Sequence, residues 1–248
     1  RHVRGCGRMR SITKGAEPRE LIQWKTANSA TPQNLFYGGG GFPGEAVRKA
    51  PLLEQLHLCA YTMKRLATFE KCERGTGDSC HIEHVLPQAR NIPSETIDYQ
   101  NMVACYPPSQ TTAACGYGAQ AKANYDPANK PFVSPLRTDA AQHFQFWDDG
   151  SVEGTTDQGI ATVTVLKLDH RALTHDRAAV IRGFLYPRNH TAVSAATARR
   201  IAAEVLQPDA NRCLHPYCVA IAAAASRHAD REERRAARIR GKSRSGRV

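Results

Sequence analysis

The sequence predicts an α+β fold in which a mainly helical chain carries two small β-hairpins. Short strand-forming runs at residues 80–87 and 102–106 predict a loose antiparallel hairpin joined by a polar excursion. Residues 143–153 predict a smaller extra hairpin around a turn that contains glycine. Alanine-rich stretches at residues 192–206 and 218–240 predict helices. With 248 residues, 41% of them hydrophobic, the chain fits one large domain or a smaller one with appendages.

The N-terminal part of the chain begins with a basic segment without periodic pattern, residues 1–10. A short helix is expected at residues 20–24, after Pro18. Residues 28–44 include four consecutive glycines and are expected to form a loop. Because no Gly-Lys-Ser or Gly-Lys-Thr follows these glycines, the sequence excludes a phosphate-binding P-loop.

A further helix is expected to lead towards Cys59 and to support the longer hairpin. Pro51 suits the first turn of a helix, and the apolar residues after it recur on one face. His57 lies beside that face and is expected to be a partly buried helix histidine. The apolar face consists of Leu52, Leu53, Leu56 and Met63.

Beyond the longer hairpin, residues 126–134 are rich in proline and asparagine and predict a linker. In the smaller hairpin, Phe144 and Phe146 are expected to pack in the core rather than to stack on nucleic-acid bases. Residues 161–168 are ambiguous, because threonine and valine favour a strand whereas the apolar positions recur at helical spacing.

The charge of the chain favours a polyanionic partner. The net charge is +11, which supplies affinity for nucleic acid that does not depend on base sequence. Residues 227–248 hold nine cations and three acids, so this basic tail carries more than half of the excess. Such a helix is either a solvated surface or a contact for nucleic acid or a partner protein. The candidate nucleic-acid-binding residues are Arg231, Arg234, Arg235, Arg238 and Arg240.

The cysteines and the hydropathy pattern favour a cytoplasmic protein. Eight cysteines without an apolar leader at the N-terminus predict reduced thiols or metal ligands. No run of residues approaches the length of a transmembrane span, so no membrane partner is expected.

The first strand of the longer hairpin holds the residues best suited to catalysis. Glu83 directly precedes His84, which places a metal-binding oxygen beside a candidate general base. His81 shares a strand face with Glu83 and is a candidate further ligand. Asn101 opens the second strand, and Lys122 falls in the helix-prone segment after it. Together they supply candidates for what phosphodiester hydrolysis requires, namely an activated water, a cation and a stabilised leaving oxygen.

This order of strand, loop, strand and helix resembles the HNH endonucleases, which have the ββα-metal fold. The resemblance is closer still to PtuB, the HNH partner of an ATPase in Septu-type and retron-linked phage defence. It spans roughly residues 9–182, and it favours a helix at residues 161–170. The segments that carry it are residues 9–18, 58–61, 81–84, 98–101, 115–116, 132–136 and 161–170.

The resemblance implies a role for each residue of this stretch. His84 would be the general base, and Glu83 would hold a single Mg²⁺ ion, with Mn²⁺ as a substitute. Asn101 would brace the loop that carries the base rather than touch the metal. Lys122 would steady the scissile phosphate.

One departure from the family concerns the helix, where a His or Asn metal ligand usually comes directly after the second zinc-type cysteine. Gly116 stands at that position here. The missing ligand would come from Asn124 or Asp126, or water would take its place.

A structural zinc site is a further expectation with an open alternative. Cys59-Ala-Tyr-Thr62 stands where zinc-bearing HNH proteins often have Cys-x-x-Cys, so other cysteines would have to complete the site. The alternative hypothesis is that these cysteines are ordinary buried thiols. The cysteines considered as replacements are Cys72, Cys80, Cys105 and Cys115, and the preferred zinc ligands are Cys59, Cys105 and Cys115.

These assignments predict four regions: an N-terminal extension, loop and supporting helix (1–58), the HNH nuclease core (59–125), a linker, small hairpin and helix (126–190), and C-terminal helices with the basic tail (191–248). The expected function is that of a metal-dependent endonuclease acting on double-stranded DNA, as the nuclease effector of anti-phage defence with a PtuA-like ATPase. The alternative is a catalytically silent, zinc-supported nucleic-acid-binding or adaptor module.

Overall fold

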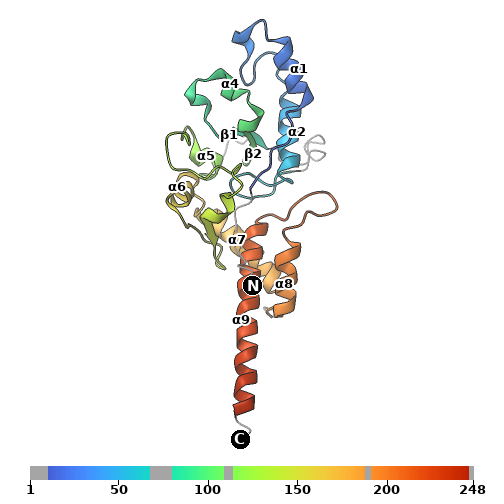
Figure 1. Cartoon of the computed structure of the whole chain (residues 1–248), viewed down its shortest axis with the longest axis vertical. Helices are drawn as coiled ribbons and strands as arrows, with labels where there is room; N and C mark the ends of the chain where they lie inside the picture. Colours follow the sequence, from blue (N-terminus) through green and yellow to red (C-terminus); the bar gives the residue numbers. More distant parts are fainter. Residues whose placement is uncertain (1–10, 68–79, 109–113, 188–190, 246–248) are drawn as a thin grey trace.

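The computed structural model describes residues 11–67, 80–108, 114–187 and 191–245, with side chains up to Arg240. Residues 9–10, where the resemblance to the HNH family begins, lie outside these segments. Cys72, one of the cysteines that could complete a zinc site, lies outside them too. The described chain combines helices with two separate two-stranded antiparallel sheets (Figure 1). The predicted α+β class is confirmed.

The longer hairpin consists of β1 (His81–His84) and β2 (Met102–Cys105), as the sequence predicts. The strands are antiparallel, with His81 opposite Cys105 and His84 opposite Met102. One turn of helix, α5 (Ala119–Lys122), follows the hairpin. The polar excursion between the strands contains η2 (Gln88–Arg90), α4 (Pro93–Thr96) and η3 (Tyr99–Asn101).

The two faces of this hairpin meet different hydrophobic clusters. Side chains alternate along a strand, so Ile82 and His84 project from one face of β1, and His81 and Glu83 from the other. Ile82 packs with Met102 in a small cluster that two N-terminal helices cover. These helices are α1 (Arg19–Ala27), where a helix is predicted, and α2 (Gly44–Glu54), which contribute Leu21, Trp24 and Val47 to the cluster.

The other face of β2 joins a large core that continues to the C-terminal helices. Phe144 and Phe146 are 1% and 2% exposed in this core, which confirms their predicted packing role. Phe132 and Val133 are buried there too, so the expected linker packs against the body although it has no helix or strand. The remaining elements are β3 (Phe144–Phe146), β4 (Val152–Gly154), α6 (Asp157–Leu166), α7 (Arg171–Leu185), α8 (Ala195–Glu204) and α9 (Cys218–Ser245).

Two helix assignments differ from the sequence prediction. The supporting helix begins at Gly44 and ends at Glu54, so Pro51 lies in its last turn rather than its first. Leu56 and His57 adopt left-handed backbone angles (φ 51° and 62°), which a right-handed helix cannot accommodate. His57 is therefore a buried turn residue rather than a helix histidine. No separate helix was predicted where α7 lies. The helix expected at residues 161–168 is confirmed by α6.

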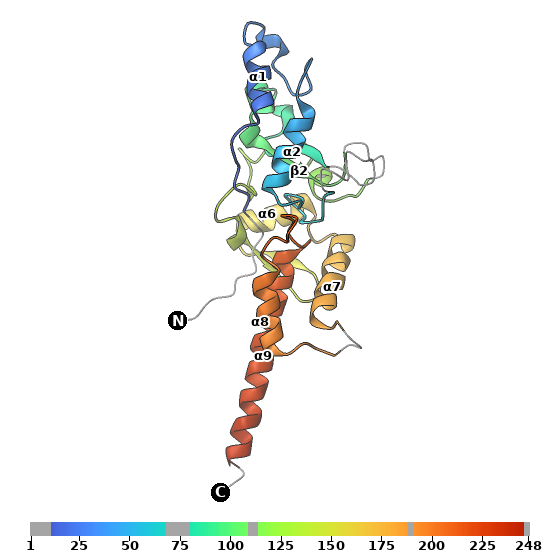
Figure 2. The same ribbon diagram turned by 90° about the vertical axis from the view of Figure 1, so that its right-hand side faces the viewer.

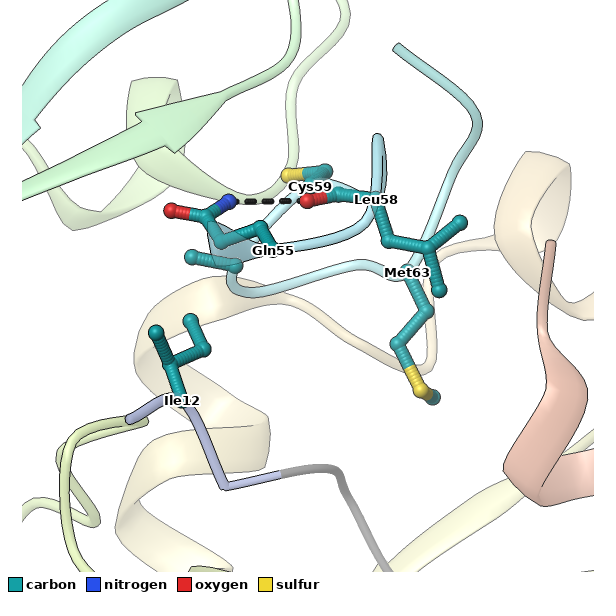
Figure 3. Close-up of a pocket in the computed structure, with 6 residues that line it drawn as sticks. Ile12, Gln55, Leu58, Cys59 and Met63 are labelled. Atoms are coloured by element: carbon teal, nitrogen blue, oxygen red, sulfur yellow. Dashed lines mark hydrogen bonds between the residues drawn. The ribbon is translucent and has the colours of Figure 1, made fainter. Parts of the chain in front are cut away.

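The side-chain amide of Gln55, at the end of α2, hydrogen-bonds to the backbone of β2 as a neighbouring strand would. Its side-chain oxygen accepts from the N–H of Ala104 at 2.8 Å, and its nitrogen donates to the carbonyl oxygens of Ala104 and Leu58 at 2.7 and 2.8 Å. Figure 3 shows this amide beside Cys59 at a small cavity. The cavity has a volume of about 10 Å³, which leaves room for about one water molecule. The cavity is therefore too small to be a substrate site.

Helix α9 gives the molecule its elongated shape. Its first turns pack against α7 and α8, and its second half extends past α8, away from the longer hairpin (Figures 1 and 2). Within the described segments, no helix combines the length and the apolar character needed to cross a bilayer. The basic part of α9 thus lies far from β1 and β2.

Candidate active site

His84 ends β1, and its imidazole is held in one orientation inside the fold, with only 5% of the residue exposed. Its Nε2 lies 2.9 Å from the carbonyl oxygen of Thr96 in α4. Because a carbonyl oxygen can only accept a hydrogen bond, Nε2 carries a proton and Nδ1 is the basic nitrogen of the neutral ring. Burial lowers the pKa of His84, against the opposing effect of the Thr96 carbonyl, and so favours that neutral form.

Two side chains that the sequence analysis did not single out border this imidazole. Nε2 of Gln88 lies 3.2 Å from Nδ1 of His84, and Gln88 is exposed. The ring of Tyr37 meets the imidazole edge-on, with ring centroids 4.8 Å apart. Gln88 has a local signal, because it follows the turn at Pro87 four residues after His84. Tyr37 has none, because the glycine-containing loop brings it from far along the chain.

Asn101 fixes the excursion that carries Thr96 and Gln88. Its side-chain oxygen accepts from the N–H of Leu86 at 2.7 Å, and its nitrogen donates to the carbonyl oxygens of Leu86 and Glu95, each at 3.0 Å. The residue is 5% exposed, so water competes little for these bonds. The geometry is that of a brace between the end of β1, the excursion and the start of β2.

Glu83 forms a buried ion pair with Lys122 of α5. Nζ of Lys122 lies 2.8 Å from Oε1 of Glu83 and 3.0 Å from the carbonyl oxygen of His84. The lysine side chain has no exposed surface, and that of Glu83 is 15% exposed. Burial raises the pKa of Glu83, and the positive charge of Lys122 opposes this shift. Lys122 therefore contacts the carboxylate, not the solvent-facing position that a phosphate contact would need.

The second oxygen of Glu83 faces His81 on the same strand face. Nδ1 of His81 donates to the carbonyl oxygen of Pro107, so in the neutral ring Nε2 is an acceptor, 4.0 Å from Oε2 of Glu83. The hydroxyl of Tyr61 is buried near Glu83. Burial raises the pKa of Tyr61, and the charge of Glu83 raises it further.

Glu83 and His81 fit one divalent cation that keeps most of its ligands as water or substrate oxygens. A carboxylate oxygen and an imidazole nitrogen that face each other can both accept a cation, and Mg²⁺ in proteins is often held by one or two carboxylates. Within the described part of the chain, no group of three or more His, Cys, Asp or Glu side chains is placed to hold a metal by itself. Glu83 and His81 are therefore the protein ligands that the geometry offers.

The candidates for a helix-borne ligand lie elsewhere. Gly116 has a left-handed backbone (φ 76°) and no side chain to offer. Asn124 is exposed beyond the end of α5. Asp126 pairs with Arg90, with 2.7 Å between Oδ2 and Nη1. The structure thus brings Lys122 to Glu83, and it places Asn124 and Asp126 in other surroundings.

Two of the three expected zinc ligands meet in the core. Cys59 and Cys105 are buried, and their thiols are hydrogen-bonded to each other. The N–H of Tyr106 also donates to Sγ of Cys59 at 3.3 Å. Burial alone would raise the pKa of Cys59, but the hydrogen bonds from Cys105, Thr62 and Tyr106 outweigh burial and lower the pKa to about 6.

Cys115, the third expected zinc ligand, does not join Cys59 and Cys105 in the structure. Cys115 is partly exposed, and its thiol donates to the carbonyl oxygen of Tyr117 at 3.3 Å. A side chain at Gly118 would meet the methyl group of Thr62 at 3.0 Å. Thr62 and Gly118, each three residues after a cysteine, therefore face each other, and neither supplies a metal ligand. Zinc binding by Cys59, Cys105 and Cys115 stays a prediction.

The basic tail is exposed along α9, but its arginines differ in their partners. Arg231 pairs with Asp148 at 2.8 Å, so it ties α9 to the turn between β3 and β4. The other four have no ion pair with any residue that the structure describes, and all are exposed. These four are Arg234, Arg235, Arg238 and Arg240.

No protein-family model matches this chain, and no curated protein matches it.

Proposed function

We propose that this chain is a metal-dependent HNH endonuclease with a ββα-metal core, which hydrolyses phosphodiester bonds in nucleic acid, most of all double-stranded DNA. The observation that carries the proposal is the state of His84. Its Nε2 donates to the Thr96 carbonyl oxygen, and its Nδ1 directs its lone pair towards the exposed Gln88. A positioned imidazole with one unprotonated nitrogen is what general-base activation of a water molecule requires.

In the proposed reaction, Nδ1 of His84 accepts a proton from a water molecule. The water oxygen then forms a bond to phosphorus as the bond from phosphorus to the 3′-oxygen breaks, and the electron pair of that bond goes to the 3′-oxygen. Burial lowers the pKa of His84, which keeps the imidazole free to accept the proton near neutral pH. Asn101 would keep the loop around the base fixed during this step.

Glu83 and His81 would hold the cation, Mg²⁺ or Mn²⁺. When bound, such an ion neutralises charge on the phosphate and stabilises the leaving 3′-oxygen. The Lys122 ammonium pairs with Glu83 and competes with the cation for its negative charge. Lys122 would therefore also affect how tightly Glu83 and His81 hold the ion.

The basic tail and the net charge of +11 support a nucleic-acid substrate. The resemblance to PtuB supports a role as nuclease effector in anti-phage defence, with a PtuA-like ATPase as partner. A plasmid assay tests the activity: purified protein should nick or linearise DNA with Mg²⁺ or Mn²⁺ and should not do so in excess EDTA. Co-purification with a co-expressed PtuA-like ATPase tests the partner.

A second candidate function has its own observation. The ion pair of Glu83 with Lys122 occupies one carboxylate oxygen, and Gly116 leaves the helix without a ligand. A catalytically silent nucleic-acid-binding or adaptor module would keep this fold while losing metal chemistry. It would bind DNA in the same assay without cutting under any metal condition.

A further inference from the structure

The exposed carboxamide of Gln88 is placed directly against the basic nitrogen of His84. Its Nε2 lies 3.2 Å from Nδ1, while Thr96 binds the opposite ring nitrogen. An amide nitrogen can only donate, and an unprotonated Nδ1 can only accept. The orientation of the carboxamide and the tautomer of the imidazole therefore support each other.

The surroundings of Gln88 differ from those of His84. The imidazole is 5% exposed and is packed edge-on by Tyr37, whereas Gln88 is exposed and begins the short turn η2 after Pro87. A side chain at the surface can change rotamer at little cost, whereas a packed imidazole cannot. The Gln88 side chain can therefore move away from Nδ1 while the His84 imidazole stays in place.

We propose that Gln88 is a positioning residue that holds the attacking water on Nδ1 of His84. This inference rests on the proposed nuclease function. Without substrate, the carboxamide nitrogen binds Nδ1 directly. With substrate, water takes that place on Nδ1 and the carboxamide moves outward by a rotamer change, donating to the water oxygen or accepting its second O–H. A water molecule held at both ends needs less reorganisation to reach phosphorus in line.

The test variant is Gln88→Met, which keeps the length of the side chain and removes its hydrogen bonds. Gln207→Met is the matched control, because Gln207 is an exposed glutamine after α8. For Gln88→Met, kcat at saturating DNA should fall by about 10-fold or more, because the attacking water loses an orienting hydrogen bond. KM should change by less than about threefold, because the residue does not bind the phosphate backbone. Gln88→Asn, which shortens the reach but keeps the amide, should recover part of the loss.

A spectroscopic measurement gives a second readout that needs no cleavage. In metal-free protein at one pH where His84 is neutral, the ¹⁵N resonance of Nδ1 should move towards that of a nitrogen without a hydrogen bond in Gln88→Met. The Nε2 resonance should stay in place, and both should be unchanged in Gln207→Met. An Nδ1 that is itself protonated, or whose resonance is the same in Gln88→Met as in the parent, would overturn the proposal.

The outcomes separate the two proposals. A parent protein that cleaves DNA while Gln88→Met cleaves it equally fast overturns the role of Gln88 alone. A parent protein that cleaves no DNA under any metal condition overturns the nuclease function and, with it, the positioning of a water. A fall in kcat with unchanged KM and a shifted Nδ1 resonance supports both.

Discussion

Glu83 and His84 are neighbours in β1 whose side chains project from opposite faces of the hairpin. Glu83 pairs with Lys122 on the face of α5, and His84 meets Tyr37 and Thr96 on the face of the N-terminal helices. In an in-line displacement, the attacking and leaving oxygens lie on opposite sides of phosphorus. A base and a cation-binding carboxylate on opposite faces of one strand suit that requirement.

Replacing His84 tests the base. His84→Ala should lower kcat by roughly 10²- to 10⁴-fold, because general-base catalysis typically contributes that much. The control is His175→Ala, which removes an exposed histidine of α7. Circular dichroism should show both variants folded. Near-normal plasmid nicking by a folded His84→Ala protein would remove His84 from the mechanism.

Replacing Glu83 tests the cation site. Glu83→Gln should require more Mg²⁺ or Mn²⁺ for half-maximal cleavage, because a neutral amide is a poorer ligand for a hard cation and has nearly the same shape. DNA affinity should stay close to that of the parent, since the residue is largely buried. If the metal titration curves of variant and parent coincide, Glu83 is not the ligand.

Replacing Lys122 tests the ion pair, and it has opposite effects on stability and metal binding. Lys122→Met should lower the free energy of unfolding by about 3 kcal/mol, because it leaves a mostly buried carboxylate without its partner. It should also tighten Mn²⁺ binding, because the competing ammonium is gone. Lys130→Met, at an exposed lysine, is the control.

A double-mutant cycle isolates the pair from the rest of the effect. Glu83→Gln with Lys122→Met should be more stable than the sum of the single changes predicts, since no buried charge is left unpaired. Denaturant unfolding measures the four proteins. Additive losses would show that the two groups do not interact in solution.

The order of strands and helix could be predicted because its signals are local. Strand-forming runs, a proline stop and apolar spacing lie within each segment, and they gave β1, β2, the smaller hairpin, α6, α8 and α9. The end of α2 could not be predicted, because Leu56 and His57 adopt left-handed angles in the turn that follows Gln55, whose side chain bonds to β2. Tertiary contacts there override the apolar spacing.

The candidate site shows the same division. Glu83, His84 and Asn101 were found from their order along two strands, and the structure places them around one hairpin. The buried position of Lys122 was not predicted, because a helix lysine is usually solvated and only tertiary packing turns it inward. Tyr37 was missed for a related reason, since a flexible-looking loop carries no periodicity to indicate which side chain packs on His84.

Elemental analysis decides the zinc question. Less than about 0.2 equivalents of zinc in protein purified without chelator would identify Cys59, Cys105 and Cys115 as ordinary buried thiols, because a structural site normally binds metal near stoichiometrically. Near one equivalent, lost in a Cys59→Ser variant, would instead show that Cys59, Cys105 and Cys115 come together in solution.

The basic half of α9 extends away from β1 and β2 (Figure 1). Four of its arginines are exposed without an ion pair to any described residue, at spacings that bring several guanidinium groups onto nearby faces. They can bind phosphates but are too far from His84 to affect chemistry. Replacing them by glutamine should weaken DNA binding for all sequences and leave cleavage at saturating DNA intact. The four are Arg234, Arg235, Arg238 and Arg240.

The salt dependence of binding distinguishes this role from the alternatives. If each arginine releases one counterion, the slope of log K against log salt should become shallower by up to about 3.6. A control protein with four exposed arginines replaced elsewhere has the same net charge and should keep most of the slope; these are Arg19, Arg171, Arg182 and Arg200. An unchanged slope in the tail variant would mean that α9 is only a solvated surface. Unchanged DNA binding with loss of ATPase co-purification would identify α9 as the contact for the partner protein.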